Sequence, residues 1–319
     1  MESEQLTPAQ RAVLAELGAT PDERPRFDPA LGDRLRAHVE ADLAAVAHEV
    51  DPQDPVVVTK HALAMVHGCE ARYLAEQADP FAWTVPMARG VVAHKAIELS
   101  VHLEGEPEPL DLVDESLARL AEDDWSLGQW LRTLAEVDLA ELRSIANDRV
   151  SAFLECFPPL KSRWRPVTES RVRSELLDGR VVLTGKVDLT LGRAEGSTAG
   201  KVLLDLKTGR THPQHREDLR FYALLETIRI GTPPRRVASY YLDRARFEAE
   251  DVNEDLLFAA AERLLDGASR MIELGEQPGG AVKRTGPACR WCPLLERCEE
   301  GRRHLDDADE ASGIDTDLY

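Results

Sequence analysis

The stretch GKVDLTLGRAEGSTAGKVLLDLKTG, residues 185–209, constrains the fold of this chain more than any other feature. Apolar and polar residues alternate from Val181 to Leu191, and this alternation predicts a β-strand with two different faces. A second strand is expected over KVLLDLKT, after a loop rich in glycine and serine. The two segments therefore predict a β-hairpin, and Asp205 and Lys207 project from one face of its second arm because they lie two residues apart.

This hairpin carries residues that suit metal-assisted phosphodiester hydrolysis. Asp188 lies in the first arm, and Asp205 and Lys207 lie in the second. Carboxylates hold Mg²⁺ or Mn²⁺, the metal activates water, and a lysine steadies the attacking water or the charge that develops on phosphorus. Taken alone, Asp-x-Lys favours an ordinary solvent-facing hairpin, so the choice depends on the rest of the chain.

Composition limits the class of protein. The chain has 319 residues, 43% hydrophobic and 30% charged, enough for one large domain or two modest ones. No apolar run approaches a membrane span and MESEQLTPAQ is not typical of a signal peptide, so we expect a soluble cytoplasmic protein. The formal net charge of −19 argues against nonspecific coating of nucleic acid. Basic residues gather around Trp164 and near the C-terminus, which leaves a local basic groove open.

The order of the predicted core elements is helix, three strands, helix, strand. Helices are expected over residues 7–18, 30–50, 59–77, 87–99, 126–157, 213–229 and 252–273, and DLVDESLARLAED predicts one more. Strands are expected at PVTESRVRSELL, RVVLTGKVDLTL, KVLLDLKT and RRVASYYLD. The first three are expected to form an antiparallel meander, in which an Asp178-Gly179 turn joins the first strand to the second. Trp125 is expected to face the core.

These elements suggest one main domain with additions. We expect a helical N-terminal extension over 1–55, a domain over 56–304 and an acidic, disordered tail over 305–319. Residues 105–157 are interpreted as an acidic helical insertion within the domain, and residues 281–304 as a cysteine segment.

Four of the five cysteines have an informative spacing. Cys289, Cys292 and Cys298 form C-x2-C-x5-C, and Cys69 lies far upstream. A cytoplasmic chain does not rely on disulfides, so this compact cluster indicates a metal centre with Cys69 as its fourth ligand. Four thiolates can hold a 4Fe-4S cluster or Zn²⁺. Cys156 has no partner by spacing and is interpreted as a packed thiol.

Taken together, these residues resemble the PD-(D/E)XK nuclease superfamily, and within it the RecB-like branch with an iron–sulfur cluster. That branch includes the AddB nuclease domain and CRISPR-associated RecB-like exonucleases. The resemblance spans about Lys60 to Arg302, and its parts occur in the family's order. They are a first cysteine, a glycine–histidine helix, a Gly-x-x-Asp strand, an Asp-x-Lys strand, a tyrosine helix and three cysteines. The resemblance implies an α/β fold with a restriction-endonuclease-like core, in which helices flank a mixed central β-sheet.

The resemblance also implies roles for residues around the hairpin. His94 in RGVVAHKAIE matches a histidine of the family's metal site. Asp188 in GKVD and Asp205 in LLDLK match the two acids that bind the metal, and the main-chain carbonyl of Leu206 is expected to reach it. Lys207 matches the catalytic lysine.

Two further matches come from the following helix and from the cysteines. Tyr222 in DLRFYALL matches the tyrosine of the family's Gln-x-x-x-Tyr motif, counted among the catalytic residues. Asp218 stands where glutamine is usual, and this departure concerns DNA handling more than metal binding. Glu169 is either an outer acid of the site or an exposed surface residue. The resemblance favours a 4Fe-4S cluster over zinc, with ligands Cys69, Cys289, Cys292 and Cys298.

The implied activity is hydrolysis of DNA with Mg²⁺ or Mn²⁺, as an exonuclease or on single-stranded ends, in repair, recombination or defence. The implied substrate is single-stranded DNA or duplex ends. No Walker A sequence is present, so a helicase or a repair or defence protein would be a separate partner chain. The alternatives are a catalytically weak DNA-binding or scaffolding subunit on the same fold and a zinc-stabilised interaction module.

Overall fold

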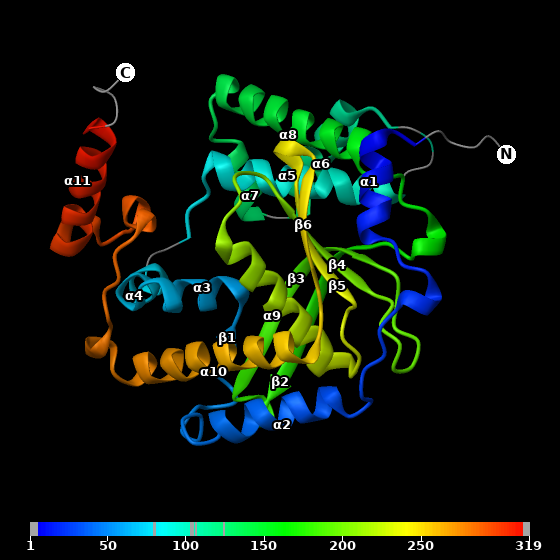
Figure 1. Ribbon diagram of the computed structural model, residues 1–319. Helices are drawn as coiled ribbons and strands as arrows, with labels where there is room; N and C mark the ends of the chain where they lie inside the picture. Colours follow the sequence, from blue (N-terminus) through cyan, green and yellow to red (C-terminus); the bar gives the residue numbers. More distant parts are fainter. Residues whose placement is uncertain (1–5, 79–80, 103–104, 106, 124, 315–319) are drawn as a thin grey trace. The chain divides into compact units, whose positions relative to one another are not determined.

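The structure is a computed structural model that describes residues 6–78, 81–102, 105, 107–123 and 125–314 (Figure 1). The chain divides into two compact units, each assembled from three segments of sequence. The first unit contains residues 1–36, 82–174 and 184–260, and the second contains residues 37–81, 175–183 and 261–319. This division does not coincide with the expected N-terminal extension over 1–55, because a boundary between the units falls inside it.

The first unit combines most of a β-sheet with the helices that cover it. Its strands are Val167–Leu176 (β2), Val181–Leu191 (β3), Val202–Lys207 (β4), Arg236–Tyr241 (β5) and Arg246–Asp251 (β6). Its helices are Pro8–Leu17 (α1), the start of Leu31–Leu43 (α2), Val85–His102 (α5), Pro109–Asp123 (α6), Trp125–Leu131 (α7), Glu136–Cys156 (α8), Pro213–Ile230 (α9) and the start of Glu254–Glu276 (α10). The mixed sheet flanked by helices confirms the expected fold class.

Strand pairing places the acids of the hairpin on one face. β3 and β4 are antiparallel with Leu189 opposite Leu204, β4 and β5 are parallel, and β5 and β6 are antiparallel. Leu189 and Leu204 belong to a core formed with α1 and α8, which includes Val13 and Phe153. Since side chains alternate along a strand, Asp188 and Asp205 point to the opposite face.

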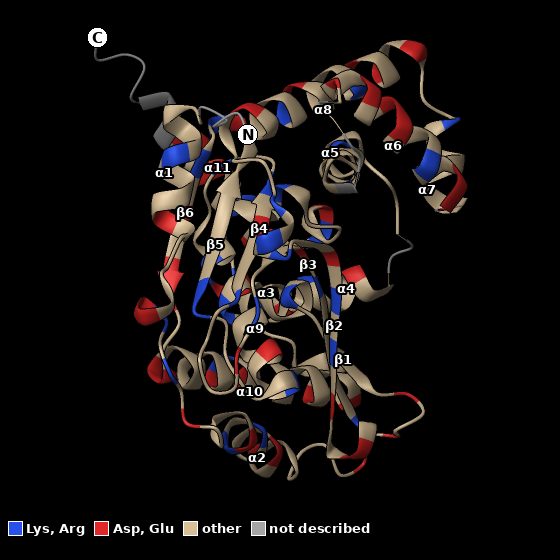
Figure 2. Ribbon diagram, turned by 90° about the vertical axis from the view of Figure 1, so that its right-hand side faces the viewer, with Lys and Arg blue, Asp and Glu red and all other residues tan. Residues whose placement is uncertain are grey.

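A second, helical core of the first unit is formed by α5, α6, α7 and α8, which are grouped together in Figure 1. Its buried residues include Val92, Leu112, Leu127 and Leu142. Acidic residues recur along α6 and α8 (Figure 2), and most of them are exposed, as expected for a solvated acidic surface. Trp125, by contrast, is 72% exposed and does not face the core as expected.

The second unit contains a short parallel strand and several helices. Val56–Val58 (β1) pairs with the first three residues of β3, with Val56 opposite Val181. Lys60–Gly68 (α3), Glu70–Ala78 (α4), the rest of α10 and Glu299–Ile314 (α11) complete it. A Cβ atom at Gly267 would lie 2.5 Å from Leu63, so α10 approaches α3 closely at this glycine. No helix of the described residues is long and apolar enough to cross a membrane.

The observed elements differ from the predicted ones in four respects. The helix expected over 59–77 ends at Gly68, because Cys69 adopts an extended conformation between α3 and α4. The helix expected over 126–157 is divided into α7 and α8, and the strands β1 and β6 were not predicted. The tail expected to be disordered is helical as far as Ile314, while residues 315–319 lie outside the described part. Glu299 and Glu300 suit the first turn of α11, and the Arg290–Asp309 ion pair holds the helix farther along.

Candidate active site

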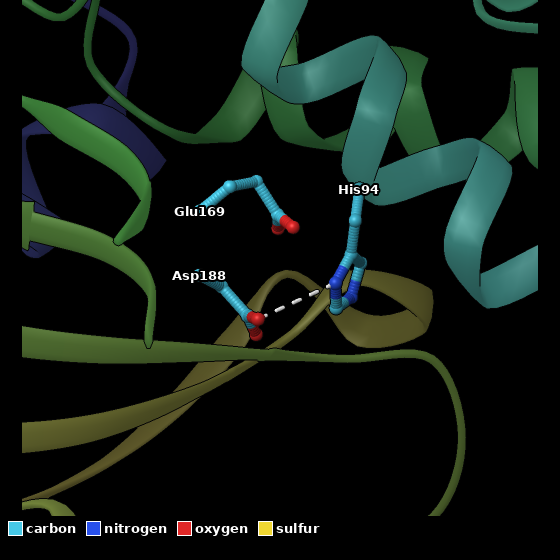
Figure 3. Close-up of side chains that lie close together, drawn as sticks. All are labelled: His94, Glu169 and Asp188. Carbon is cyan, nitrogen blue, oxygen red and sulfur yellow. Dashed lines mark ion pairs between the residues drawn. The ribbon is translucent and has the colours of Figure 1, made fainter. Parts of the chain in front are cut away.

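Three side chains from three different elements converge on one point of the first unit. His94 comes from α5, Glu169 from β2 and Asp188 from β3, and their potential ligand atoms all lie within 4.8 Å of one another (Figure 3). One imidazole nitrogen and two carboxylates form a donor set that can hold a divalent cation. The structure therefore groups two of the residues predicted for the metal site with Glu169, for which an outer acid of the site and an exposed surface residue were both expected as alternatives.

The backbone of Glu169 explains how its carboxylate reaches this point. Glu169 has a φ of 52° inside β2, a left-handed conformation that is uncommon for a residue other than glycine. Such strained positions persist where surrounding contacts enforce them, and they gather at functional sites. The carboxylate of Glu169 also forms an ion pair with Lys186 of the neighbouring strand β3. The alternating pattern of the sequence gives no signal for this local reversal, so Glu169 was not predicted to join His94 and Asp188.

Asp188 is nearly buried and is oriented from two sides. One of its oxygens lies 3.5 Å from Nδ1 of His94, and the other accepts a hydrogen bond of 2.7 Å from the backbone N–H of Leu206. Burial disfavours the charged form of His94, but the carboxylates of Asp188, Glu169 and Asp205 outweigh that effect and raise its pKa. The negative charge at this point therefore favours a cation, whether a proton or a metal ion.

Asp205 and Lys207 form a second group beside the first. Asp205 is 1% exposed and forms an ion pair with Lys207, whose ammonium also lies 3.5 Å from a carboxylate oxygen of Asp218. The other oxygen of Asp218 accepts a hydrogen bond of 3.0 Å from the side chain of Gln214, one helical turn earlier in α9. Asp218 thus contacts the lysine directly, and a glutamine lies one turn before the position where the resemblance placed it.

Tyr222 lies on the same helix and supports the strand that carries Asp188. Its hydroxyl donates a hydrogen bond of 2.8 Å to the carbonyl of Lys186. A Cβ atom at Gly185 would lie 2.5 Å from the tyrosine ring, so the glycine of the GKVD sequence is required for this close approach. Tyr222 therefore acts on the position of the strand that carries Asp188.

His215 is a further residue near Lys207 that the sequence reasoning did not identify. Its Nδ1 atom lies 3.1 Å from the hydroxyl of Tyr241. Burial, together with the positive charge of Lys207, lowers the pKa of His215 to about 4. The imidazole of His215 is therefore neutral at ordinary pH and adds no positive charge beside Lys207.

Comparison with known families agrees with this geometry. Residues 58–299, most of the chain, match the model of the PD-(D/E)XK nuclease superfamily. The chain belongs to this superfamily. No curated protein matches it at a significant level. A solved structure from Eubacterium rectale with the provisional name exonuclease is 11% identical, with a TM-score of 0.43, over 77% of this chain and 87% of that one. The structure of SSO0001 is 17% identical, with a TM-score of 0.32, over 66% and 95%.

Members of the PD-(D/E)XK superfamily use divalent metals, and the residues of this chain fit that requirement. His94, Glu169 and Asp188 would hold the ion, and all three offer hard or intermediate donor atoms rather than sulfur. The predicted contributions of Asp205 and of the Leu206 carbonyl to the same ion stay predictions, since Asp205 lies outside the group of three.

The four predicted cluster ligands all lie in the second unit. Cys69 occupies the break between α3 and α4, and the other three lie in or beside short turns over Pro287–Trp291 and Leu295–Arg297. No three cysteine sulfur atoms of the described residues lie within 4.8 Å of one another. Three sulfurs nevertheless accept backbone N–H contacts of 3.4–3.5 Å, from Arg284 to Cys69, Gly286 to Cys289 and Gly301 to Cys298.

Glu70 explains why the loop after α10 lies against Cys69. This buried carboxylate accepts hydrogen bonds of 2.8 Å from Arg270 of α10 and from the backbone N–H of Val282. The backbone N–H of Glu70 in turn donates to the carbonyl of Val282. The hydrogen bond from Arg270 is the main reason that the pKa of Glu70 is lowered. Glu70 therefore ties the residue after Cys69 to the segment that leads to the other three cysteines.

Proposed function

We propose that this protein is a Mg²⁺- or Mn²⁺-dependent deoxyribonuclease, acting as a RecB-like exonuclease or on single-stranded DNA ends. The observation that carries the proposal is the adjacency of the two groups on one sheet face. His94, Glu169 and Asp188 form a ligand set, and the Asp205–Lys207 pair lies beside it. A phosphodiester hydrolase of this kind needs a cation site and a fixed ammonium close together.

The residues of the chain have separate roles in this reaction. A divalent ion, when bound, would supply an activated water and neutralise charge on the scissile phosphate. Asp188 is fixed by the N–H of Leu206, so its free oxygen faces the ligand set without reorganisation. Lys207 is held between Asp205 and Asp218, and it would steady the attacking water or the charge that develops on the phosphate oxygens.

Labelled single-stranded and duplex DNA, incubated with the full chain and Mn²⁺, Mg²⁺ or EDTA, tests this proposal. We expect cleavage that depends on the metal, and we expect circular single-stranded DNA to resist an exonuclease. Asp188→Asn should abolish cleavage, whereas Asp178→Asn is a matched control because Asp178 is 98% exposed in a turn. Lys207→Met should retain metal affinity and lose rate by about 100-fold or more, the range for a removed charge-stabilising group.

The alternative is a DNA-binding or scaffolding subunit with weak catalysis. The net charge of −19 and the acidic surfaces of α6 and α8 favour it, because such surfaces suit a basic partner protein better than DNA. Metal-dependent cleavage that survives purification to homogeneity and disappears with Asp188→Asn would exclude this alternative.

We further propose that Cys69, Cys289, Cys292 and Cys298 hold a 4Fe-4S cluster with a structural role, and that zinc is the runner-up. A tetrahedral zinc site would bring its sulfurs to about 3.8 Å from one another, from Zn–S bonds of about 2.3 Å. A cubane binds each thiolate at a different iron and so holds the sulfurs farther apart, which agrees with the absence of three cysteine sulfurs within 4.8 Å of one another among the described residues. The N–H contacts to three sulfurs support this proposal. Anaerobic purification with iron, sulfide and zinc analysis tests it; stoichiometric zinc would select the runner-up.

A further inference from the structure

A polar pocket lies in the first unit, away from the candidate metal site and the Asp205–Lys207 pair. It has a volume of about 250 Å³ and is bordered by α1, by residues 157–164 and by the adjoining ends of β3 and β4. Val13, Leu17 and Val202, which line it, belong to the core on the α1 side of the sheet. Asp188 and Asp205 point to the other face, so the sheet separates this pocket from the candidate metal site.

Positive charge dominates one half of the pocket. Three arginines line it, Arg24, Arg163 and Arg235, and no aspartate or glutamate does. The Nε atom of Arg24 is shielded from solvent and has no hydrogen-bond partner among the described residues. Arg235 is 8% exposed and donates one hydrogen bond to the carbonyl of Leu17. Burial lowers the pKa of Arg235, and the nearby Arg236 and Arg24 lower it further.

Two glycines shape the backbone at the edge of this pocket. A Cβ atom at Gly200 would lie 2.2 Å from the carbonyl oxygen of Arg193 and 3.3 Å from Nη1 of Arg24, so the guanidinium lies directly over bare backbone. Gly192 has a φ of 76°, and its N–H donates a hydrogen bond of 2.6 Å to the carbonyl of Trp164. This bond fixes Trp164 at the wall of the pocket.

The other half of the pocket is apolar and partly aromatic. Trp164, Phe157 and Leu191 line it, and the guanidinium of Arg163 lies 5.8 Å from the centre of the indole ring. Arginine forks recognise phosphate oxygens, and indole rings stack on nucleobases. The pocket volume of about 250 Å³ lies just below the usual range for ligand pockets, which begins at about 300 Å³. This volume suits one small planar group with one anionic group.

We propose that this pocket binds a single nucleotide, with its phosphate on Arg24 and Arg163 and its base against Trp164. The ligand is either a free 5′-mononucleotide or one nucleotide of a DNA strand, since both present the same chemistry. This inference goes beyond the proposed nuclease activity, because it concerns a different face of the sheet and needs no metal ion.

Calorimetric titration of the full chain with deoxyadenosine 5′-monophosphate in EDTA tests the proposal. We expect saturable binding, which Arg24→Gln weakens about tenfold, as expected for the loss of one charge-assisted contact. Trp164→Leu should also weaken it. Arg26→Gln is the matched control, because Arg26 is exposed and does not line the pocket. Thermal melting of each variant shows whether it is folded, and Asp188→Asn should bind like the wild type, so a failed cleavage assay leaves this result unaffected.

Three further ligands separate the outcomes. Deoxyadenosine and inorganic phosphate should each bind more weakly than the nucleotide, because each offers half of its contacts. Equal binding of phosphate and nucleotide would overturn the proposal in favour of a simple anion site. A 5′-phosphorylated hexanucleotide that binds at least tenfold more tightly, through Arg24 and Trp164, would identify a DNA strand as the source of the ligand. Absence of binding by both the mononucleotide and the hexanucleotide would refute a nucleotide site.

Discussion

The candidate metal site and the cysteine segment are organised in contrasting ways. His94 and Asp188 are carried by a long helix and a long strand, and each carboxylate near them already has a partner within the chain. The cysteines lie in a helix break and in or beside short 3-10 turns. The sulfurs of Cys69, Cys289 and Cys298 accept backbone N–H groups at 3.4–3.5 Å, and Cys298 also lies 3.6 Å from the carboxylate of Glu300. The first site is formed by the fold itself, whereas the second lies in backbone that a bound centre would stabilise.

The largest effect expected from this contrast concerns Glu169. Glu169→Gln should reduce metal-dependent cleavage by more than about 100-fold, since even residues that only support metal ligands account for about 10–100-fold. Stability should change little, because Glu169 lies at the start of its strand and its partner Lys186 is half exposed. Cleavage rate against Mn²⁺ concentration is the measurement. Glu195→Gln, in an exposed loop, is the control, and an unchanged rate for Glu169→Gln would remove Glu169 from the ligand set.

A smaller effect on rate is expected at Asp218. Asp218→Asn should lower kcat about tenfold and leave KM and the metal requirement unchanged, because Asp218 contacts Lys207 and not the ligand set. Asp218→Gln places the usual residue of the superfamily at this position and should keep more activity than Asp218→Ala. Equal activity of the wild type and the alanine variant would show that Asp205 alone positions the lysine.

In the cysteine segment the expected effect is on stability. Cys69→Ala should remove most of the bound metal and lower the melting temperature by about 5–10 °C, at about 2–4 °C per kcal/mol. Cys156→Ala, whose thiol lies in the first unit, is the matched control and should retain the metal. Metal content and melting are measured on the same anaerobic sample. A Cys69→Ala protein with full metal content would contradict the assignment of this cysteine and weaken the contrast between the two sites.

The pH dependence of stability tests the description of His215 and its neighbour Lys207. The pKa of His215 falls from 6.5 to about 4 on folding, so the unfolded chain binds more protons between these values. His215 therefore makes stability rise with pH from about 4 to 6.5, and this contribution is lost as the pH falls through that window. His215→Gln should flatten the dependence of the urea midpoint on pH over this range. His48→Gln, an exposed control, should leave it unchanged.

Local patterns correctly predicted the central hairpin, with its acidic residues on one face, because strand alternation is a property of neighbouring residues. The helix α1 also begins and ends where Thr7, Pro8 and Gly18 predict. The place of Glu169 in the candidate metal site was not predicted, because its position depends on a left-handed backbone conformation within a strand. The three residues of β1 carry no signal of their own, since they become a strand only by pairing with β3, more than a hundred residues away. Contacts distant in sequence therefore account for what the patterns did not reveal.

The smallest effect we predict concerns the support of the catalytic strand by Tyr222. Tyr222→Phe keeps the ring over Gly185 and removes only the hydrogen bond to the Lys186 carbonyl, so it should lower the free energy of unfolding by about 0.5–1.5 kcal/mol. Gly185→Ala introduces a Cβ atom at 2.5 Å from the same ring and should cost more, about 1–3 kcal/mol, because the ring or the strand must shift. Urea denaturation gives both values, and cleavage rates should fall in the same order, since Asp188 follows Gly185 on the displaced strand. If Tyr222→Phe lost activity without losing stability, its hydroxyl would act in the reaction itself. Support of the strand that carries Asp188 would then not be the only role of Tyr222.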